Sequence, residues 1–364
     1  MSAHGTIPRS SWIFPLLSVL LFAGISATGY SFSQTAVGWL FAAVLLVILF
    51  GTVFAAVHHA EMVAARIGEP FGTLLLTLSV TIIEVALIAT IMLGEQAATT
   101  LARDTVFAVV MIVCNGLVGV CILVGGLRYS EQDIQVSGSS VYLSVLAVLS
   151  VITLIMPNYT LTTPGPFYSA GQLGFVSAAT ILLYAVFLYT QTVRHRDYFV
   201  GRSNRAAGGP HASNRMTGLS LGLLLLSLLA VVLLAKKFSQ VVDAAAAITG
   251  APPAFAGIVV ALLILLPESV AAINAARRND LQKSMNLALG SSLATIGLTI
   301  PAVAVAARAL DRQLVLGLPA HDVVLLALTL MLCMLTLGGG RTNILFGLVH
   351  LVVFAVFVFL VFVP

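Results

Sequence analysis

Charged side chains are scarce in this sequence. Lysine, arginine, aspartate and glutamate make up 8% of its 364 residues, whereas soluble globular proteins carry about a quarter. Hydrophobic residues make up 60%. Such a composition excludes a water-soluble domain, and at about 20 apolar residues per crossing it provides roughly ten or eleven membrane-spanning helices. The sequence therefore predicts an all-α polytopic membrane protein.

Cysteine is also rare, and its positions exclude a disulfide framework. Cys114, Cys121 and Cys333 all lie inside apolar runs. An odd number of thiols at lipid depth forms no structural framework and gives no indication of the redox compartment.

Apolar stretches between charged or Gly/Pro-marked breaks predict eleven transmembrane helices. Their expected bounds are 12–29, 36–57, 71–93, 104–126, 141–157, 169–192, 217–235, 253–276, 284–307, 320–337 and 343–363. The first stretch is interpreted as a span and not as a signal peptide, because its basic region is weak and no convincing small-residue cleavage site follows it.

The distribution of lysine and arginine predicts the orientation. If the N-terminus is cytoplasmic, twelve of the 17 cationic residues fall inside and five outside. The five outside are Arg103, Lys236, Lys237, Arg308 and Arg312. We therefore expect a bacterial inner-membrane protein with its N-terminus inside and its C-terminus outside. The formal charge of +4 then reflects contact with the bilayer and not with nucleic acid.

One long hydrophilic segment divides the chain. Residues 193–216 are rich in Arg, Gly and Ser and are expected to form a flexible, basic cytoplasmic linker; a regulatory or lipid-headgroup site is the alternative. Residues 1–30 are predicted to form an extra N-terminal helix, 31–192 a first five-helix repeat and 217–364 a second. Two units with an odd number of crossings, joined by one loop, have opposite topology. This is the inverted-repeat plan of secondary transporters.

Two glutamates lie where lipid-spanning helices rarely carry charge. Glu84 is near the middle of the 71–93 span, and Glu268 is a little past the middle of 253–276. A carboxylate at that depth costs about 2.5 to 3.5 kcal/mol on insertion scales, so it is a functional candidate by default. The alternative is a protonated glutamic acid that only joins helices. Each glutamate is on the second helix of its repeat, so an inverted repeat brings the two to equivalent places.

Neutral oxygen donors accompany the two acids. On the first acidic helix, Thr81 belongs to a polar stripe that ends at Glu84. On the second, Pro267 removes an amide donor and frees a carbonyl, and such broken backbone supplies ion ligands. The fourth and ninth helices carry further candidate ligands in equivalent places, although close helix packing is the alternative for the small residues among them. These candidates are Asn115, Ser291 and Ser292.

This donor set predicts exchange of a cation for protons. Carboxylate, carbonyl and hydroxyl oxygens suit Ca²⁺, Na⁺ or K⁺. Two empty, ionised carboxylates in a low-dielectric site repel each other, so protons and metal compete for the same oxygens. The cation is then a substrate, and we expect no bound cofactor and no enzymatic activity. The oligomeric state stays open.

The histidines are less decisive. His58 and His59 lie where the second helix is expected to reach the cytoplasm, and a histidine at a helix end is usually solvated surface. His59 is also a candidate for proton translocation, because an imidazole changes charge near neutral pH. His350 falls inside the last span and is expected to hydrogen-bond a neighbouring helix.

Motifs along nearly the whole chain resemble the calcium/proton antiporter family of the calcium/cation antiporter superfamily, closest to the bacterial sodium/potassium/calcium-proton antiporters. The motifs are His59-Ala-Glu61, Arg66-Ile-Gly-Glu-Pro-Phe-Gly72, Ser79-Val-Thr-Ile-Ile-Glu84, Asn115-Gly-Leu-Val-Gly119, Leu266-Pro-Glu268, Asn286 with Gly290-Ser291-Ser292, and Arg341-Thr-Asn343 before His350. The resemblance implies an eleven-helix fold with two inverted five-helix repeats, and it implies that Glu84 and Glu268 match the cation-binding acids.

The sequence departs from the superfamily at one point. Gly-Asn usually stands four and three residues before each acid, whereas here Val80-Thr81 and Ile264-Leu265 occupy those places. Fewer amide oxygens make Na⁺ or K⁺ an alternative or an addition to Ca²⁺. A channel or uniporter that uses the same glutamates is the alternative mechanism, which inverted halves disfavour. An intramembrane metalloprotease is excluded, because no H-E-x-x-H motif is present.

Overall fold

A computed structural model describes residues 8–68, 71–92, 99–199, 214–252 and 254–363. Among these residues, eleven helices are long and apolar enough to cross a membrane. The prediction of an all-α polytopic protein with eleven spans is confirmed. The chain packs as two compact units, and each unit takes segments from both halves of the sequence: unit 1 comprises 1–97 and 208–251, and unit 2 comprises 98–207 and 252–364.

The described residues of unit 1 form four helices. They are α1 (Arg9–Thr28), α2 (Ala36–Ile67), α3 (Phe71–Met92) and α8 (Asn214–Thr249). Helix α2 packs against the other three, and α8 contacts α1 and α3 as well. Helix α2 begins at a threonine cap, where the Thr35 hydroxyl accepts a hydrogen bond from the Gly38 amide over 3.2 Å. At its other end Arg66 donates to the Asn214 side chain over 2.6 Å, which ties α2 to the start of α8.

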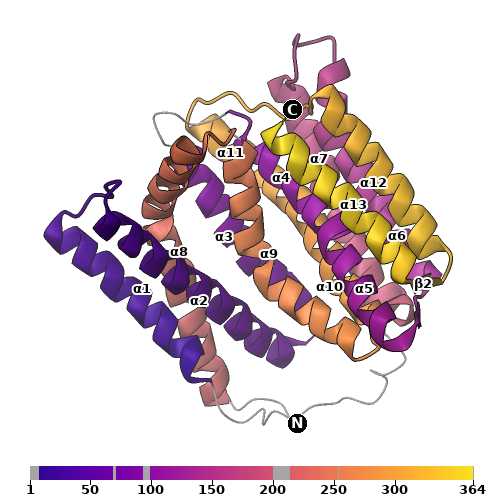
Figure 1. The fold of residues 1–364 in the computed structure, drawn as a ribbon, viewed down its shortest axis with the longest axis horizontal. Coiled ribbons are helices and arrows are strands. Elements are labelled where there is room, and N and C mark those ends of the chain that lie inside the picture. The colour runs from indigo at the N-terminus through magenta and orange to yellow at the C-terminus, as the bar shows by residue number, and fades with distance from the viewer. Residues whose placement is uncertain (1–7, 69–70, 93–98, 200–213, 253, 364) are drawn as a thin grey trace. The chain divides into compact units, whose positions relative to one another are not determined.

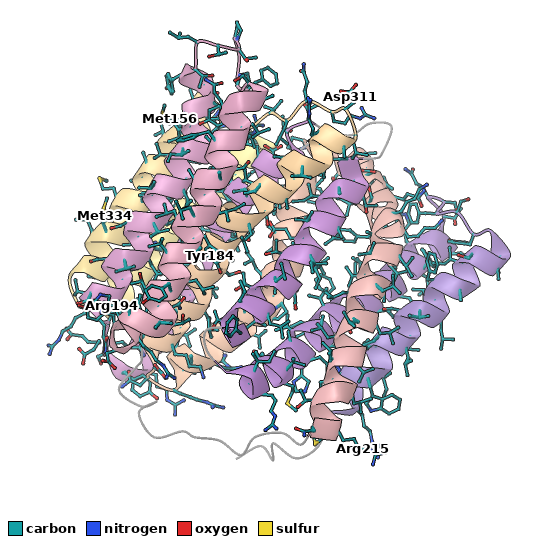
Figure 2. The ribbon with its side chains drawn as sticks, turned by 180° about the vertical axis from the view of Figure 1, so that it is seen from behind. Met156, Tyr184, Arg194, Arg215, Asp311 and Met334 are labelled. Carbon is teal, nitrogen blue, oxygen red and sulfur yellow. The ribbon has the colours of Figure 1, made fainter. Side chains whose placement is uncertain are left out.

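The first part of unit 2 contains three spans. One is continuous through α4 (Leu101–Met111), the π-helical turn η1 (Ile112–Leu117) and α5 (Val118–Tyr129). The second consists of α6 (Val136–Ser150), η2 (Val151–Ile155) and η3 (Met156–Tyr159). The third consists of α7 (Ala170–Tyr189) and η4 (Thr190–Arg194), which the short turn η5 (Arg196–Tyr198) follows. Arg194 and Met156 mark opposite ends of this unit (Figure 2).

The second part of unit 2 contains four spans. They are α9 (Ala254–Arg277), then α10 (Leu281–Ala294) with the π-helical turn η7 (Thr295–Thr299) and α11 (Ile300–Ala309), then α12 (Ala320–Gly338) and α13 (Ile344–Phe362). Helices α12 and α13 lie side by side (Figure 1). The span Leu101–Tyr129 is the core of the unit, because 89% of its apolar window is buried and it contacts α9, α10 and α13.

A short two-stranded sheet, whose strands come from distant parts of the chain, closes one end of unit 2. Strand β1 (Glu131–Asp133) pairs antiparallel with β2 (Arg341–Asn343), with Gln132 opposite Thr342. The buried Gln132 side chain donates to the carbonyl oxygen of Ala276 over 3.2 Å. The same carbonyl also accepts from the backbone amide of Asn279 over 3.1 Å, so both bonds hold the last turn of α9.

Two helices are longer than the sequence predicts. Helix α2 ends at Ile67 and not at 57, and α8 ends at Thr249 and not at 235. Lys237 therefore lies inside α8 and not in an outside loop, and its ammonium donates to the Tyr30 carbonyl over 2.9 Å. At 36 residues α8 is about 54 Å long, well beyond a hydrocarbon core of about 30 Å, so a hydropathy window finds only part of it. Most of the predicted linker, residues 200–213, lies outside the described residues.

Candidate cation site

Glu84 is buried in the middle of a membrane-spanning helix of unit 1. It is the fourteenth of the 22 residues of α3, and 1% of its surface is exposed. Thr81, one turn earlier on the same helix, is buried as well. Helix α3 packs against α2 and α8, so the carboxyl group faces protein and not lipid. The other acids inside unit 1 helices, Glu61 and Asp243, are exposed, and burial separates Glu84 from both.

Glu268 occupies a matching position in unit 2. It is the fifteenth of the 24 residues of α9 and is half-buried. Helix α9 continues through Pro267, so the break in the backbone expected at this proline is wrong. The proline still removes one amide donor, because the Leu263 carbonyl has no N–H four residues later. A single freed carbonyl in a continuous helix is the local consequence.

π-helical turns interrupt the fourth, fifth, sixth and ninth spans, and those of the fourth and ninth lie in or next to the predicted ligand segments. The π-helical turn η1 contains Asn115, and η7 begins at Thr295 and ends just before Pro301. In a π-helical turn the backbone hydrogen bonds join residues five apart, one more than in an α-helix, and such turns often mark functional sites. In the sequence, the Asn115-Gly116 pair lies inside η1 and Pro301 follows the end of η7 by two residues, so these residues are the local features that could have indicated the two turns. In η7, Gly297 allows close packing, because an added Cβ atom would lie 2.8 Å from the Cβ atom of Tyr184 on α7 (Figure 2 shows Tyr184).

Unit 2 brings the helices of four predicted site residues into contact. Helix α9 carries Glu268, α10 carries Ser291 and Ser292, and η1 carries Asn115. All three elements pack against one another. Ser292 and Asn115 are fully buried, and Ser291 is half-buried. Glu84 and Thr81 belong to unit 1, so their approach to these residues stays a prediction.

The side chain of Asn115 is held by the last two helices. Its Nδ2 atom donates to the Thr329 hydroxyl of α12 over 2.8 Å, and its Oδ1 atom lies 3.3 Å from Nδ1 of His350 on α13. The Nε2 atom of His350 lies 3.0 Å from the Thr336 hydroxyl. The expectation that His350 bonds a neighbouring helix is confirmed. The sequence reasoning missed Thr329 and Thr336, although their spacing of seven places both on one face of a helix.

His59 lies inside α2 and is fully buried. The interpretation of this residue as solvated surface is therefore wrong. Its Nε2 atom is 2.9 Å from the backbone oxygen of Ser11 in α1, and the two rings of His58 and His59 are 5.6 Å apart. The structure thus gives His59 a partner in the extra N-terminal helix, and its part in proton transfer stays a prediction.

Asn286, four residues before Gly290, holds the segment that leads to the predicted linker. Its side-chain amide donates to the carbonyl oxygen of Phe199 and accepts from Gln282 over 2.9 Å. The Phe199 ring is buried and meets Tyr142 edge to face, with ring centroids 5.4 Å apart. Because Asn286 bonds a backbone carbonyl and a neighbouring amide, we assign it to fixing this segment and not to the cation.

A pocket of about 290 Å³ lies at the other end of unit 2, where α4 and α12 begin. Arg103 pairs with Asp104 over 2.7 Å at its rim, and His321 and Asp322 also line it. Phe107 and Phe357 contribute to its apolar part. None of the predicted ligands lines this pocket.

Comparison with known proteins identifies relatives over the whole chain. The family model described as sodium/calcium exchanger protein matches residues 36–193 and 219–363. The chain is 44% identical to the putative ionic transporter y4hA of Sinorhizobium fredii (strain NBRC 101917 / NGR234), covering 100% of this chain and 98% of that protein. It is 37% identical to the sodium-potassium/proton antiporter ChaA of Escherichia coli (strain K12), covering 97% of this chain and 96% of ChaA.

Solved structures share the fold at low sequence identity. Native YfkE superposes with a TM-score of 0.74 at 18% identity, covering 97% of this chain and all of YfkE. The H⁺/Ca²⁺ exchanger CAX superposes with a TM-score of 0.69 at 15% identity, covering 96% of this chain and 89% of that one. The matched segments of the family model leave out α1 and the stretch between α7 and α8.

Proposed function

Because the chain belongs to the sodium/calcium exchanger protein family, we propose that it exchanges cytoplasmic Ca²⁺, and also Na⁺ or K⁺, for protons across the bacterial inner membrane. The exchange takes place by alternating access to a site that Glu84 and Glu268 share. The chain is a multi-pass membrane protein and a cation exchanger by family; the paired-glutamate site, the direction and the choice of cation are the proposal.

One observation carries the proposal: two carboxyl groups occupy matching positions along two apolar spans. Glu84 is residue 14 of 22 in α3, and Glu268 is residue 15 of 24 in α9. Each carboxylate at this depth costs about 2.5 to 3.5 kcal/mol on insertion scales. A cation shared by both carboxylates offsets much of that cost, because it neutralises them in a low-dielectric site.

Neutral oxygens complete the proposed ligand set. No group of three or more His, Cys, Asp and Glu side chains that could hold a metal is found in the part of the chain that the structure describes. Two carboxylates supply at most four oxygens, whereas Ca²⁺ takes six to eight. Thr81 on α3 and Ser291 and Ser292 on α10 are the proposed hydroxyl ligands, and Asn115 supplies an amide or backbone oxygen from η1.

Competition between protons and metal couples the two fluxes. When the cation leaves, two ionised carboxylates would repel each other, so at least one of them takes up a proton. If the protein changes conformation only with a neutralised site, each cycle exchanges one species for the other. His59 is the further group proposed for proton transfer; its bond to Ser11 offers a structural role instead, and a stability measurement separates the two.

A cation channel or uniporter that uses the same glutamates is the alternative. The relative ChaA is described as a sodium-potassium/proton antiporter, which supports exchange over a channel and supports Na⁺ and K⁺ as transported cations. By contrast, a channel would carry a cation flux that is independent of the proton gradient.

The test uses everted membrane vesicles with a pH-sensitive dye and, in parallel, purified protein in liposomes. An acidified lumen should lose protons when CaCl₂, NaCl or KCl is added outside, and MgCl₂ should act least because Mg²⁺ dehydrates reluctantly. The Glu84→Gln variant at equal expression is the control. Cation uptake that proceeds equally fast with and without a proton gradient, at a clamped membrane potential, would favour the channel.

A further inference from the structure

Four buried side chains form a continuous hydrogen-bonded chain beside the π-helical turn η1. Thr336 contacts Nε2 of His350 over 3.0 Å, Nδ1 of His350 contacts Oδ1 of Asn115 over 3.3 Å, and Nδ2 of Asn115 donates to Thr329 over 2.8 Å. All four residues have 0% of their surface exposed. Three separate elements, α12, α13 and η1, supply them.

The partners of His350 select one form of its ring. The amide oxygen of Asn115 can only accept a hydrogen bond, so Nδ1 of His350 carries the proton that is donated to it. Both ring nitrogens face uncharged groups in a fully buried place, where an unpaired imidazolium would be costly. In the neutral ring Nε2 then accepts from the hydroxyl of Thr336. One tautomer satisfies both contacts.

Close packing of two helix backbones fixes the position of this ring. A Cβ atom added at Gly347 of α13 would lie 2.8 Å from the backbone nitrogen of Leu123 in α5, and one added at Gly119 would lie 3.1 Å from the Cβ atom of His350. Both positions therefore need glycine, and the two backbones approach closely beside the ring. This packing and the two hydrogen bonds of the ring place the imidazole next to Asn115.

The turn that the ring supports lies between the elements of the proposed site. On one side, η1 packs against α9 and α10, which carry Glu268 and the serine pair. On the other side it meets α12 and α13, where the Cys333 thiol also donates to the Cys114 carbonyl over 3.8 Å. A change in how α12 and α13 hold η1 would therefore shift the turn against the ligand-bearing helices.

We propose that His350 is a positioning residue of the exchanger: as a neutral ring protonated on Nδ1, it orients the Asn115 side chain and holds η1 in register with α9 and α10. It neither touches the cation nor carries a transported proton. The proposal rests on the exchange function proposed above and names a residue that sets the apparent affinity of that site.

Two amide substitutions separate the two contacts of the ring. In His350→Asn the amide nitrogen takes the place of Nδ1 and can still donate to Asn115, whereas in His350→Gln it takes the place of Nε2 and reaches Thr336. The half-saturating concentration of the best-transported cation, measured in proteoliposomes, should rise about tenfold in His350→Gln and stay within about threefold of wild type in His350→Asn, since tenfold corresponds to about one lost buried hydrogen bond. Thr336→Val is the matched control and should also stay within about threefold of wild type.

Equal loss of maximal rate in all three variants with unchanged half-saturation would overturn the proposal, because a purely structural role lowers only the amount of active protein.

A second readout does not depend on transport. In protein labelled with ¹⁵N-histidine, the resonances that vanish in His350→Asn should show a neutral ring protonated on Nδ1. A ring protonated on Nε2, or on both nitrogens, would overturn the proposal in wild-type protein without any variant. If the wild type transports no cation while the ring has the expected tautomer, the proposed function fails and the assignment of the hydrogen-bonded chain stands.

Discussion

The Nε2 atom of His59 in α2 donates a hydrogen bond over 2.9 Å to the carbonyl oxygen of Ser11 in α1. In a helix, this oxygen would normally accept from the backbone amide four residues later. That residue is Pro15, which has no N–H. The imidazole thus replaces a donor that the proline removes. Ser11 and His59 are both buried, so water does not satisfy this carbonyl, and the hydrogen bond ties the N-terminal helix to α2.

We first predict that Pro15→Ala repairs the loss of His59. The His59→Leu variant should lower the free energy of unfolding by about 1–3 kcal/mol, because it leaves a buried carbonyl unsatisfied. The double variant should recover most of this loss, since an alanine in place of Pro15 supplies a backbone amide to the Ser11 carbonyl, and His59→Gln should retain a donor. Unfolding in a mixed detergent series measures all three. Unchanged stability of His59→Leu together with lost proton coupling would instead assign His59 to proton transfer.

The second prediction concerns the two midspan acids. Glu84→Gln and Glu268→Gln should each reduce cation-driven proton movement by at least about a hundredfold, because losing a charged ligand costs on the order of 3 kcal/mol. Both proteins should remain folded in the membrane. Glu131→Gln is the matched control, because this exposed acid of β1 pairs only at the surface with Arg341. Exchange near the wild-type rate in either midspan variant, at equal expression, would rule out the two-carboxylate mechanism.

The third prediction is a pH dependence of cation affinity. Metal binding requires deprotonated carboxylates, so the half-saturating cation concentration should fall as pH rises and level off once the pair has lost its protons. The measurement uses proteoliposomes at several pH values without a pH gradient or membrane potential. Thr81→Val should displace the curve to higher pH, if the buried hydroxyl one turn before Glu84 bonds the ionised form. A flat profile with intact transport would show that protons and cation use separate sites.

The fourth prediction concerns orientation. Arg194 and Asp311 are exposed and lie at opposite ends of unit 2 (Figure 2), so cysteines introduced there report the two sides of the membrane. We expect an impermeant thiol reagent to label Asp311→Cys in intact cells and to leave Arg194→Cys unlabelled until the cells are opened. The native cysteines Cys114, Cys121 and Cys333 are buried and give a low background. The reverse labelling pattern would invert the proposed topology.

The sequence by itself determined the number of spans and the two acids within them. Both are local properties: a span needs about 20 apolar residues in a row, and a carboxylate in such a run is costly whatever its neighbours are. Each predicted span therefore begins close to its structural start, and Glu84 is buried in the middle of α3 as expected. The ends of α2 and α8 were missed because these helices continue past the apolar run, where packing and not hydropathy maintains them.

Only the tertiary structure decided what the polar side chains do. His59 meets Ser11 across 48 residues of sequence and His350 meets Asn115 across 235, and no local pattern encodes pairs so far apart. The close approach of Gly297 in the π-helical turn η7 to Tyr184 likewise joins residues that are far apart in the sequence. A buried polar group must find a partner, but which partner it finds depends on how the helices pack, and that is a property of the whole fold.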